Sequence, residues 1–419
     1  MKIRIGAFFA VLMLLITTFF VPAAADTKNE RITASMAAFL DESGDIIGVS
    51  SKGEWDEYPE NSIPAIEEAA KTDIDFVAID VKKAGCGTLI VFSDDTTERM
   101  LACETVFTVA DTDYSVLSSY TLRNSCGGSN EKATDYTIPT LSQAIETATE
   151  NDIPLIIRCT ADIIPLVNDE LYRLEASDMC IIMTDGTKKQ ISAALSACSE
   201  KPYVIGSKKG NVIFNIMSYV SFLEEISAEG VELKTSNRYG INFYPSLVGM
   251  YSRKLRVISD TTTPEISGYR QDSETWWNDL ISRGYSVIIT DHAELFAQYK
   301  EKTAEARSRL QVLFDKYVTN HTLPDFKDDV LNDLKKAYTD AVANAQRLLS
   351  DGSSSYQELC DGYSMLFKAA NDINKNFSAL EDGSAGTTVT LPRILLCTAA
   401  LAVVIVVQIY FYKRRRRDA

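Results

Sequence analysis

Short runs of β-branched and apolar residues alternate with stretches of helical periodicity between about residue 45 and residue 300. The runs that predict buried strands are 46–50, 76–81, 89–92, 154–159, 180–183, 203–206, 240–244, 256–259 and 286–290. The stretches that predict amphipathic helices are 63–71, 141–149, 188–198, 216–228 and 273–282. Strands that alternate with helices favour a parallel sheet, and eight or nine such strands are typical of a (β/α)₈ barrel. The predicted fold class is therefore α/β, with a TIM barrel over residues 31–300.

Polar residues follow several of these predicted strands. A barrel of this kind binds its ligands at the carboxyl ends of its strands, so the residues found there are the first candidates for a site. They are Ser51, Lys52, Asp80, Ser93, Asp94, Arg158 and Asp291.

The pattern changes after residue 300, where apolar residues recur at helical spacing in three successive stretches. Polar segments at 320–325 and 351–355 separate these stretches. Three amphipathic helices bury their apolar faces against each other, so residues 301–380 are predicted to form a small all-α bundle or stalk. Its spacing is similar to the three-helix FIVAR modules of Gram-positive surface proteins, which implies a spacer or a weak carbohydrate contact. Residues 381–393 are predicted to be a flexible linker.

Both ends of the chain carry membrane-targeting patterns. Residues 1–25 combine a basic start, an apolar run and three small residues, which predicts a cleaved signal peptide, with an uncleaved anchor as the alternative. Residues 394–412 form an apolar stretch that, at about 1.5 Å per residue, spans roughly 28 Å and predicts a transmembrane helix. The basic tail at 413–419 favours the cytoplasmic side. We therefore predict a single-pass type I protein of the cell membrane whose bulk is extracellular.

The net charge and the cysteines narrow the choice of partners. The chain has a formal charge of −16, and because the predicted leader carries +2 and the tail +4, the segment between them carries about −22. A surface this acidic repels polyanions, so nucleic acid is not an expected partner. Seven of the eight cysteines precede the predicted transmembrane helix, without the close pairs of a metal site. A disulfide among Cys86, Cys103 and Cys126 is compatible with secretion.

Several motifs then occur in one order along the predicted barrel. Their residues are Gly53, Pro59-Glu60-Asn61-Ser62, Ala78-Ile79-Asp80, Ser93-Asp94, "TIPTLSQAI" at 137–145 and "GYSVIITDHAELFAQY" at 284–299. Together they resemble the glycerophosphodiester phosphodiesterase family over about residues 45–300. The resemblance implies a TIM barrel and a phosphodiester hydrolase of lipid metabolism. It also implies two histidines as general acid and base, and a divalent cation held by Glu, Asp and Glu.

This chain departs from the family at the positions of its chemistry. Ser51 and Ser93 stand where the resemblance implies histidines, and an unassisted hydroxyl does not replace imidazole as an acid or base at neutral pH. The chain has two histidines, His292 and His321, and neither matches a family catalytic position. We therefore expect no catalytic residues.

The implied cation ligands are changed as well. Ala78 has no side-chain oxygen, and Arg158 stands where a carboxylate is implied, so only Asp80 is kept. A guanidinium repels a divalent cation by several kcal/mol at about 5 Å and an effective dielectric near 20. We expect no cofactor, and Ca²⁺ or Mg²⁺ on the weak candidates Glu60, Asp80 and Asp94 is the alternative.

One hypothesis connects these changes: Arg158 takes the place of the cation and pairs with Asp80. Lys52, Asn61 and Arg158 are then candidates for holding an anion such as a phosphate or a glycerophosphodiester. A purely structural pair between Arg158 and Asp80 is the alternative. The same two possibilities exist for the whole protein, which is either a pseudoenzyme with a binding or interaction role or an active phosphodiesterase with altered catalytic residues.

Overall fold

The computed structural model describes residues 29–41, 44–210, 212–234, 242, 244–252, 254–262, 272–318 and 329–381. The predicted signal peptide, transmembrane helix and basic tail lie outside these residues, as do His321 and the linker beyond residue 381. Within the described ranges, no helix combines the length and the apolar character needed to cross a bilayer.

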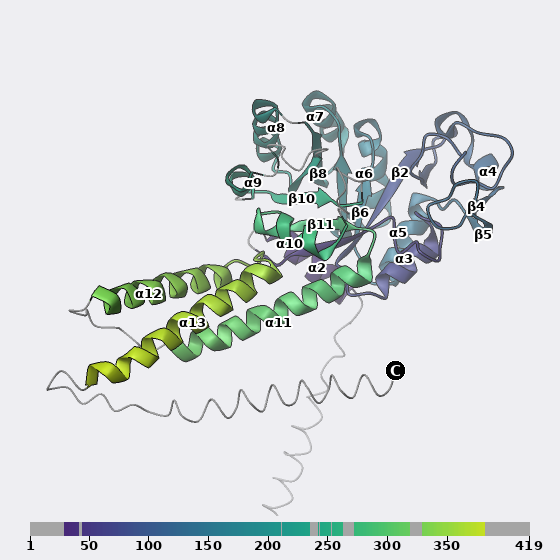
Figure 1. The fold of residues 1–419 in the computed structure, drawn as a ribbon. Helices are drawn as coiled ribbons and strands as arrows, with labels where there is room; N and C mark the ends of the chain where they lie inside the picture. The colour runs from purple at the N-terminus through teal and green to yellow at the C-terminus, as the bar shows by residue number, and fades with distance from the viewer. Residues whose placement is uncertain are drawn as a thin grey trace, which may run out of the picture.

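A closed barrel of eight parallel strands forms the centre of the molecule (Figure 1). The spatial order is β1-β11-β10-β9-β8-β7-β6-β2, and pairing of β1 with β2 closes the circle. The barrel strands are β1 (Ile47–Ser51), β2 (Phe76–Lys83), β6 (Leu155–Arg158), β7 (Cys180–Thr184), β8 (Tyr203–Lys209), β9 (Gly230–Lys234), β10 (Arg256–Asp260) and β11 (Val287–Thr290). The predicted TIM barrel is therefore confirmed.

Helices surround these strands because their apolar faces cover the outer surface of the barrel (Figure 1). They are α3 (Ile63–Ala70), α5 (Leu141–Glu150), α6 (Ile164–Arg173), α7 (Lys188–Ala197), α8 (Ile213–Glu225), α9 (Pro245–Tyr251), α10 (Glu274–Ser282) and α11 (Ala293–Val318). Capping boxes at Thr140 and Thr187 begin α5 and α7, because each threonine accepts from the backbone N–H three residues later. These caps fix where the two helices begin.

One predicted strand is present but lies outside the barrel, and one barrel strand was not predicted. The run at 89–92 gives β3 (Leu89–Val91), which pairs antiparallel with β2 and is no part of the barrel. The sixth barrel strand is β9, which was not predicted, and most of the predicted strand 240–244 lies outside the described residues. The hydrophobic pattern does not predict β9, because the charged residue Glu232 interrupts its apolar run, although the Glu232 side chain is buried.

An insertion between β2 and α5 forms a small lobe beside the barrel mouth (Figure 1). It contains η1 (Val109–Asp111), α4 (Tyr114–Leu117) and the hairpin of β4 (Thr121–Arg123) with β5 (Ala133–Thr137). The lobe has its own apolar core, made of residues such as Phe92, Leu101 and Leu122. Its cysteines Cys86, Cys103 and Cys126 are free thiols, as are the other cysteines in the described part of the chain.

The amino-terminal helix α2 (Glu30–Leu40) closes the opposite end of the barrel. Phe39 packs edge-on against Phe76, the first residue of β2, with ring centroids 5.4 Å apart. Arg256, the first residue of β10, is buried and its Nε donates to the carbonyl oxygen of Phe39 at 3.1 Å. A ligand therefore has to enter at the carboxyl ends of the strands.

Three long helices, α11, α12 (Asp329–Ser350) and α13 (Tyr356–Glu381), pack as a bundle beside the barrel (Figure 1). Their shared core includes Leu310, Ala345 and Leu366, which are all fully buried. Helix α11 runs without a break through residue 300, so the barrel and the bundle share one helix. The backbone N–H of Gln357 also donates to Asn278 Oδ1 of α10 at 3.1 Å, which ties α13 to the barrel.

Candidate functional site

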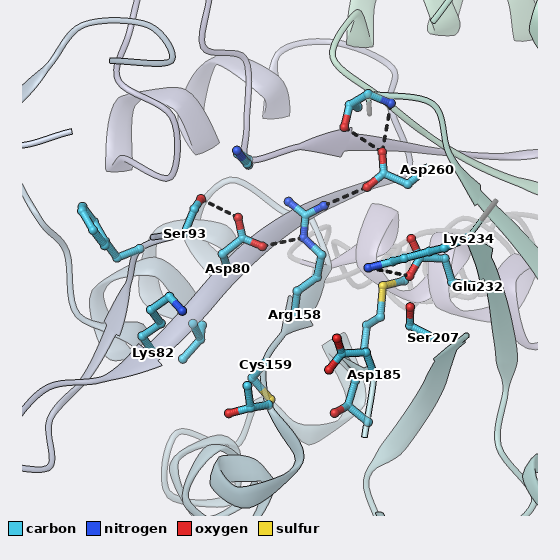
Figure 2. Close-up of a pocket in the computed structure, with 17 residues that line it drawn as sticks. Asp80, Lys82, Ser93, Arg158, Cys159, Asp185, Ser207, Glu232, Lys234 and Asp260 are labelled. Carbon is cyan, nitrogen blue, oxygen red and sulfur yellow. Dashed lines mark hydrogen bonds and ion pairs between the residues drawn. The ribbon is translucent and has the colours of Figure 1, made fainter. Parts of the chain in front are cut away.

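A cavity of about 290 Å³ lies at the carboxyl ends of the barrel strands (Figure 2). Its lining combines opposite charges in equal number. The cationic side chains are Lys52, Lys82, Arg158 and Lys234, and the anionic ones are Asp80, Asp185, Glu232 and Asp260. Such a balanced lining gives the cavity no strong preference for a ligand of either sign.

Arg158 occupies the middle of this mouth, at the end of β6 (Figure 2). Its Nε lies 2.7 Å from Asp80 Oδ1, so the predicted ion pair is present. Its Nη1 lies 3.4 Å from Asp260 Oδ2, and its Nη2 lies 3.4 Å from Ser51 Oγ. The guanidinium therefore connects β2, β10 and β1 across the barrel opening.

The second oxygen of Asp80 is also engaged. Ser93 Oγ lies 2.6 Å from Asp80 Oδ2, and Asn61 Nδ2 lies 3.2 Å from the same atom. Burial by itself would raise the pKa of Asp80, but the Arg158 guanidinium and the Lys52 ammonium hold it below its ordinary value. Asp80 is thus an ionised, fully partnered carboxylate.

Asn61 is positioned by the turn before α3, where its φ of 58° places it in the left-handed region that asparagine tolerates. Its Oδ1 accepts from the backbone N–H of Asp80 at 3.0 Å, and its Nδ2 donates to Ser93 Oγ at 2.7 Å. The side chain therefore joins the β1–α3 turn to β2 and to Ser93, two residues beyond the end of β3.

Glu60 and Asp94 are bound to cationic side chains. Glu60 is 4% exposed, and its two oxygens lie 3.0 Å from Lys52 Nζ and 2.6 Å from Arg99 Nη2. Arg99 Nε in turn lies 2.7 Å from Asp94 Oδ2. These carboxylates are thus committed to Lys52 and Arg99.

The divalent cation that the family resemblance implies does not fit the residues present. Ala78 is buried and offers no side-chain oxygen, and both oxygens of Asp80 are taken by protein groups. The Arg158 guanidinium lies against Asp80 and would repel a nearby cation. Among the described residues, no group of three or more His, Cys, Asp or Glu side chains is arranged to hold a metal.

The structure brings the sequence-predicted anion ligands Lys52, Asn61 and Arg158 to the same part of the mouth. Each of them already contacts a carboxylate, Glu60 or Asp80. The positive charges of Lys52 and Arg158 are therefore largely matched within the protein, and the role of the three residues as anion ligands stays a prediction.

Asp291 and His292 follow β11 but are not among the residues that line the cavity. Burial, and then the nearby Asp272 carboxylate, raise the pKa of Asp291 to about 7, although Trp55 Nε1 donates to its Oδ1 at 3.3 Å. His292 is exposed. It therefore supplies no imidazole to the cavity.

Sequence reasoning missed several residues of the mouth. Asp260 directly follows the predicted strand 256–259, so the rule about strand ends had the information to identify it. Arg99 lies in the inserted lobe, far from any predicted strand end. The missed residues on the far side of the cavity are Thr184, Ser207 and Glu232. Ser207 lies on β8, which is longer than the predicted strand 203–206, and Glu232 lies on β9, which was not predicted.

Comparison with known proteins supports the resemblance read from the motifs. Residues 52–187 match the model of the glycerophosphoryl diester phosphodiesterase family. No curated protein matches the chain. The match confirms the predicted family resemblance for the first half of the barrel.

Solved structures with a similar chain path include a phosphodiesterase from Oleispira antarctica in complex with the product sn-glycerol-3-phosphate, at 16% identity and a TM-score of 0.49 over 61% of this chain and 96% of that one. A glycerophosphodiester phosphodiesterase from Parabacteroides distasonis has 17% identity and a TM-score of 0.48, covering 62% of this chain and 100% of that one. Another from Agrobacterium tumefaciens has 16% identity and a TM-score of 0.46, covering 60% and 99%.

Proposed function

We propose that this chain, whose residues 52–187 match the glycerophosphoryl diester phosphodiesterase family, is a non-catalytic relative with a binding role. In this proposal the barrel mouth holds a small ligand without hydrolysing it, and the helical bundle acts as a spacer. The patterns at the two ends of the sequence support an extracellular barrel that is anchored in the cell membrane by the segment 394–412.

The position of Arg158 carries the proposal. Hydrolysis of a phosphodiester needs charge neutralisation on the phosphoryl oxygens, which the resemblance assigns to a divalent cation. Here a permanent cation lies between Asp80 and Asp260, in contact with the one implied ligand that remains. The guanidinium balances the carboxylates of the mouth and leaves them unsuited to a metal.

Proton transfer is the second missing element. Ser51 and Ser93 stand at the implied histidine positions, and their hydroxyl groups contact Arg158 and Asp80 respectively. Neither contact provides a group that titrates near neutral pH and could protonate a leaving alkoxide. The mouth thus supports binding better than turnover.

The test is an activity assay on the purified full-length protein with glycerophosphocholine and bis-p-nitrophenyl phosphate, each with and without Ca²⁺ or Mg²⁺. We expect no turnover above the buffer rate under any of these conditions. The Asp80→Asn variant is the matched control, because it removes the remaining implied ligand while keeping the side-chain shape. Metal-dependent turnover by the wild type that this variant loses would establish the active phosphodiesterase instead.

A further inference from the structure

Three polar side chains on neighbouring strands point to a second feature of the mouth, on the side of Arg158 away from Asp80. They are Thr184 at the end of β7, Ser207 on β8 and Glu232 on β9, and all three line the cavity. Ser207 is the register partner of Glu232, and Thr184 is the partner of the residue before Ser207. Figure 2 shows Ser207 and Glu232 side by side, across the cavity from Ser93. We call these three residues the polar row.

The polar row is buried but has unmet hydrogen-bonding capacity. Thr184, Ser207 and Glu232 are 2%, 3% and 1% exposed. The hydroxyl oxygens of Thr184 and Ser207 and the Oε2 atom of Glu232 make no hydrogen bond of good geometry within the protein. The Ser207 hydroxyl and the Lys234 ammonium nevertheless lie close enough to the Glu232 carboxyl to oppose the rise in its pKa. Buried polar groups are normally hydrogen-bonded, so three incompletely satisfied side chains that line one cavity are candidates for contact with a bound molecule.

The charges around the row restrict what that molecule is. Lys234 Nζ lies 3.5 Å from Glu232 Oε2, and the Arg158 guanidinium also acts on the Glu232 carboxyl. A cationic ligand group would meet these two cations, whereas an anionic group would meet the Glu232 carboxylate directly. Neutral hydroxyl groups avoid both conflicts, because they donate to the carboxylate and both donate to and accept from Ser207 and Thr184.

We propose that Thr184, Ser207 and Glu232 form a subsite for a neutral polyhydroxylated group, a monosaccharide or a short polyol. The cavity volume of about 290 Å³ lies at the small end of ligand pockets and suits a single unit of this size. The subsite rests on the proposed function in one respect: its ligand is bound and is not hydrolysed.

The experiment is ligand-observed NMR on the full-length protein with glucose, N-acetylglucosamine and glycerol as neutral probes and ethanolamine as the cationic probe, all at millimolar concentration. We expect at least one neutral probe to bind and ethanolamine not to bind. Glu232→Gln should weaken binding of that probe by about tenfold, as expected for loss of a hydrogen bond to a charged group, and Ser207→Ala should weaken it by a smaller factor.

Ser50→Ala is the matched control. Ser50 is also a buried barrel serine, on β1, whose hydroxyl has no partner, but it does not line the cavity. This variant should bind the probe as the wild type does, and thermal denaturation of each variant establishes that it is folded.

Three results would overturn the subsite: no neutral probe binds, ethanolamine binds in place of the neutral probes, or the neutral probe binds equally well to folded Glu232→Gln and Ser207→Ala. None of these depends on phosphodiesterase activity. Turnover in the assay above would refute the non-catalytic function and leave the polar row as a substrate-recognition element, so the two proposals fail separately.

Discussion

The two sides of the barrel mouth satisfy their polar groups in opposite ways. On the side of β1 and β2, Asp80, Glu60 and Asn61 contact cations, amides and hydroxyls of the protein itself. On the side of β7 to β9, the polar row is buried to a similar degree and contains atoms without partners. The carboxylates of the first side are paired within the protein, and in our proposal a bound molecule completes the second side.

This difference separates the side of the mouth where the family motifs lie from the side where we propose a subsite. The implied chemistry of the family is concentrated on the side where Arg158 has closed the network. The side that sequence reasoning overlooked is the one on which we propose the polyol subsite. If the chain is non-catalytic as proposed, it need not bind its ligand through the residues at the positions of the catalytic motifs.

Arg158→Ala should have the largest effect, because it removes the centre of the completed side. Asp80 and Asp260 would be left as poorly solvated carboxylates without their shared cation, which costs about 3–5 kcal/mol of unfolding free energy. Urea denaturation of the full-length protein measures this loss. Arg173→Ala on exposed α6 is the control and should change the midpoint little. An unchanged midpoint in Arg158→Ala would mean that the ion pairs do not hold the mouth together.

Asn61→Ala should cost about 1–3 kcal/mol, because the buried backbone N–H of Asp80 and the Ser93 hydroxyl lose a partner. The left-handed backbone of Asn61 adds to the cost, since alanine accommodates it less well. The same denaturation measurement applies, with Asn151→Ala as a comparison at a half-buried helix end. Equal losses in the two variants would contradict the special role of Asn61.

Glu232→Gln tests the incomplete side through pH. Burial, with Asp260 nearby, raises the pKa of Glu232 in the folded protein, although Lys234 opposes the shift. The folded state then binds a proton more tightly than the unfolded state, whose carboxyl titrates near pH 4.3. The contribution of Glu232 to stability is therefore full below that pH and is lost as the pH rises through the raised pKa.

In Glu232→Gln this loss should disappear, so the variant should gain stability relative to wild type as the pH rises from about 4 toward neutrality. Melting temperatures across that range provide the measurement. Asp80 has the opposite shift, so Asp80→Asn should lose relative stability on raising the pH. Parallel pH curves for the wild type and Glu232→Gln would mean that the carboxyl is not held in a desolvated site.

Lys82→Met should have the smallest effect. Lys82 lines the cavity, but its partner Asp95 is 90% exposed at the side chain, with an Nζ–Oδ1 distance of 2.6 Å. A pair this exposed contributes less than about 1 kcal/mol and weakens further in salt. A denaturation midpoint shift as large as that of Asn61→Ala would show that the completed side extends to the rim.

Much of the barrel could be predicted because local sequence patterns determine its strands and its helix caps. Seven of the eight barrel strands are apolar runs of the right length, and the cap at Thr140 begins α5 as its Thr-Leu-Ser-Gln pattern predicts. The changes at Ser51, Ser93 and Arg158 could also be identified from the sequence, because the order of the motifs shows which family positions these residues occupy. The bundle after residue 300 followed from the spacing of its apolar residues.

The tertiary structure decided which charges meet. The hairpin of β2 and β3 and the lobe after it bring Arg99 to Glu60, although 39 positions separate them in the chain. Barrel closure brings Asp260 to Arg158 over 102 positions, and sheet register places Ser207 beside Glu232. Local spacing carries no information on such contacts, because they depend on how the whole sheet closes. The sequence by itself thus determined the barrel and the loss of the motif residues, whereas only the fold decided which polar groups are satisfied and which still face the cavity without a partner.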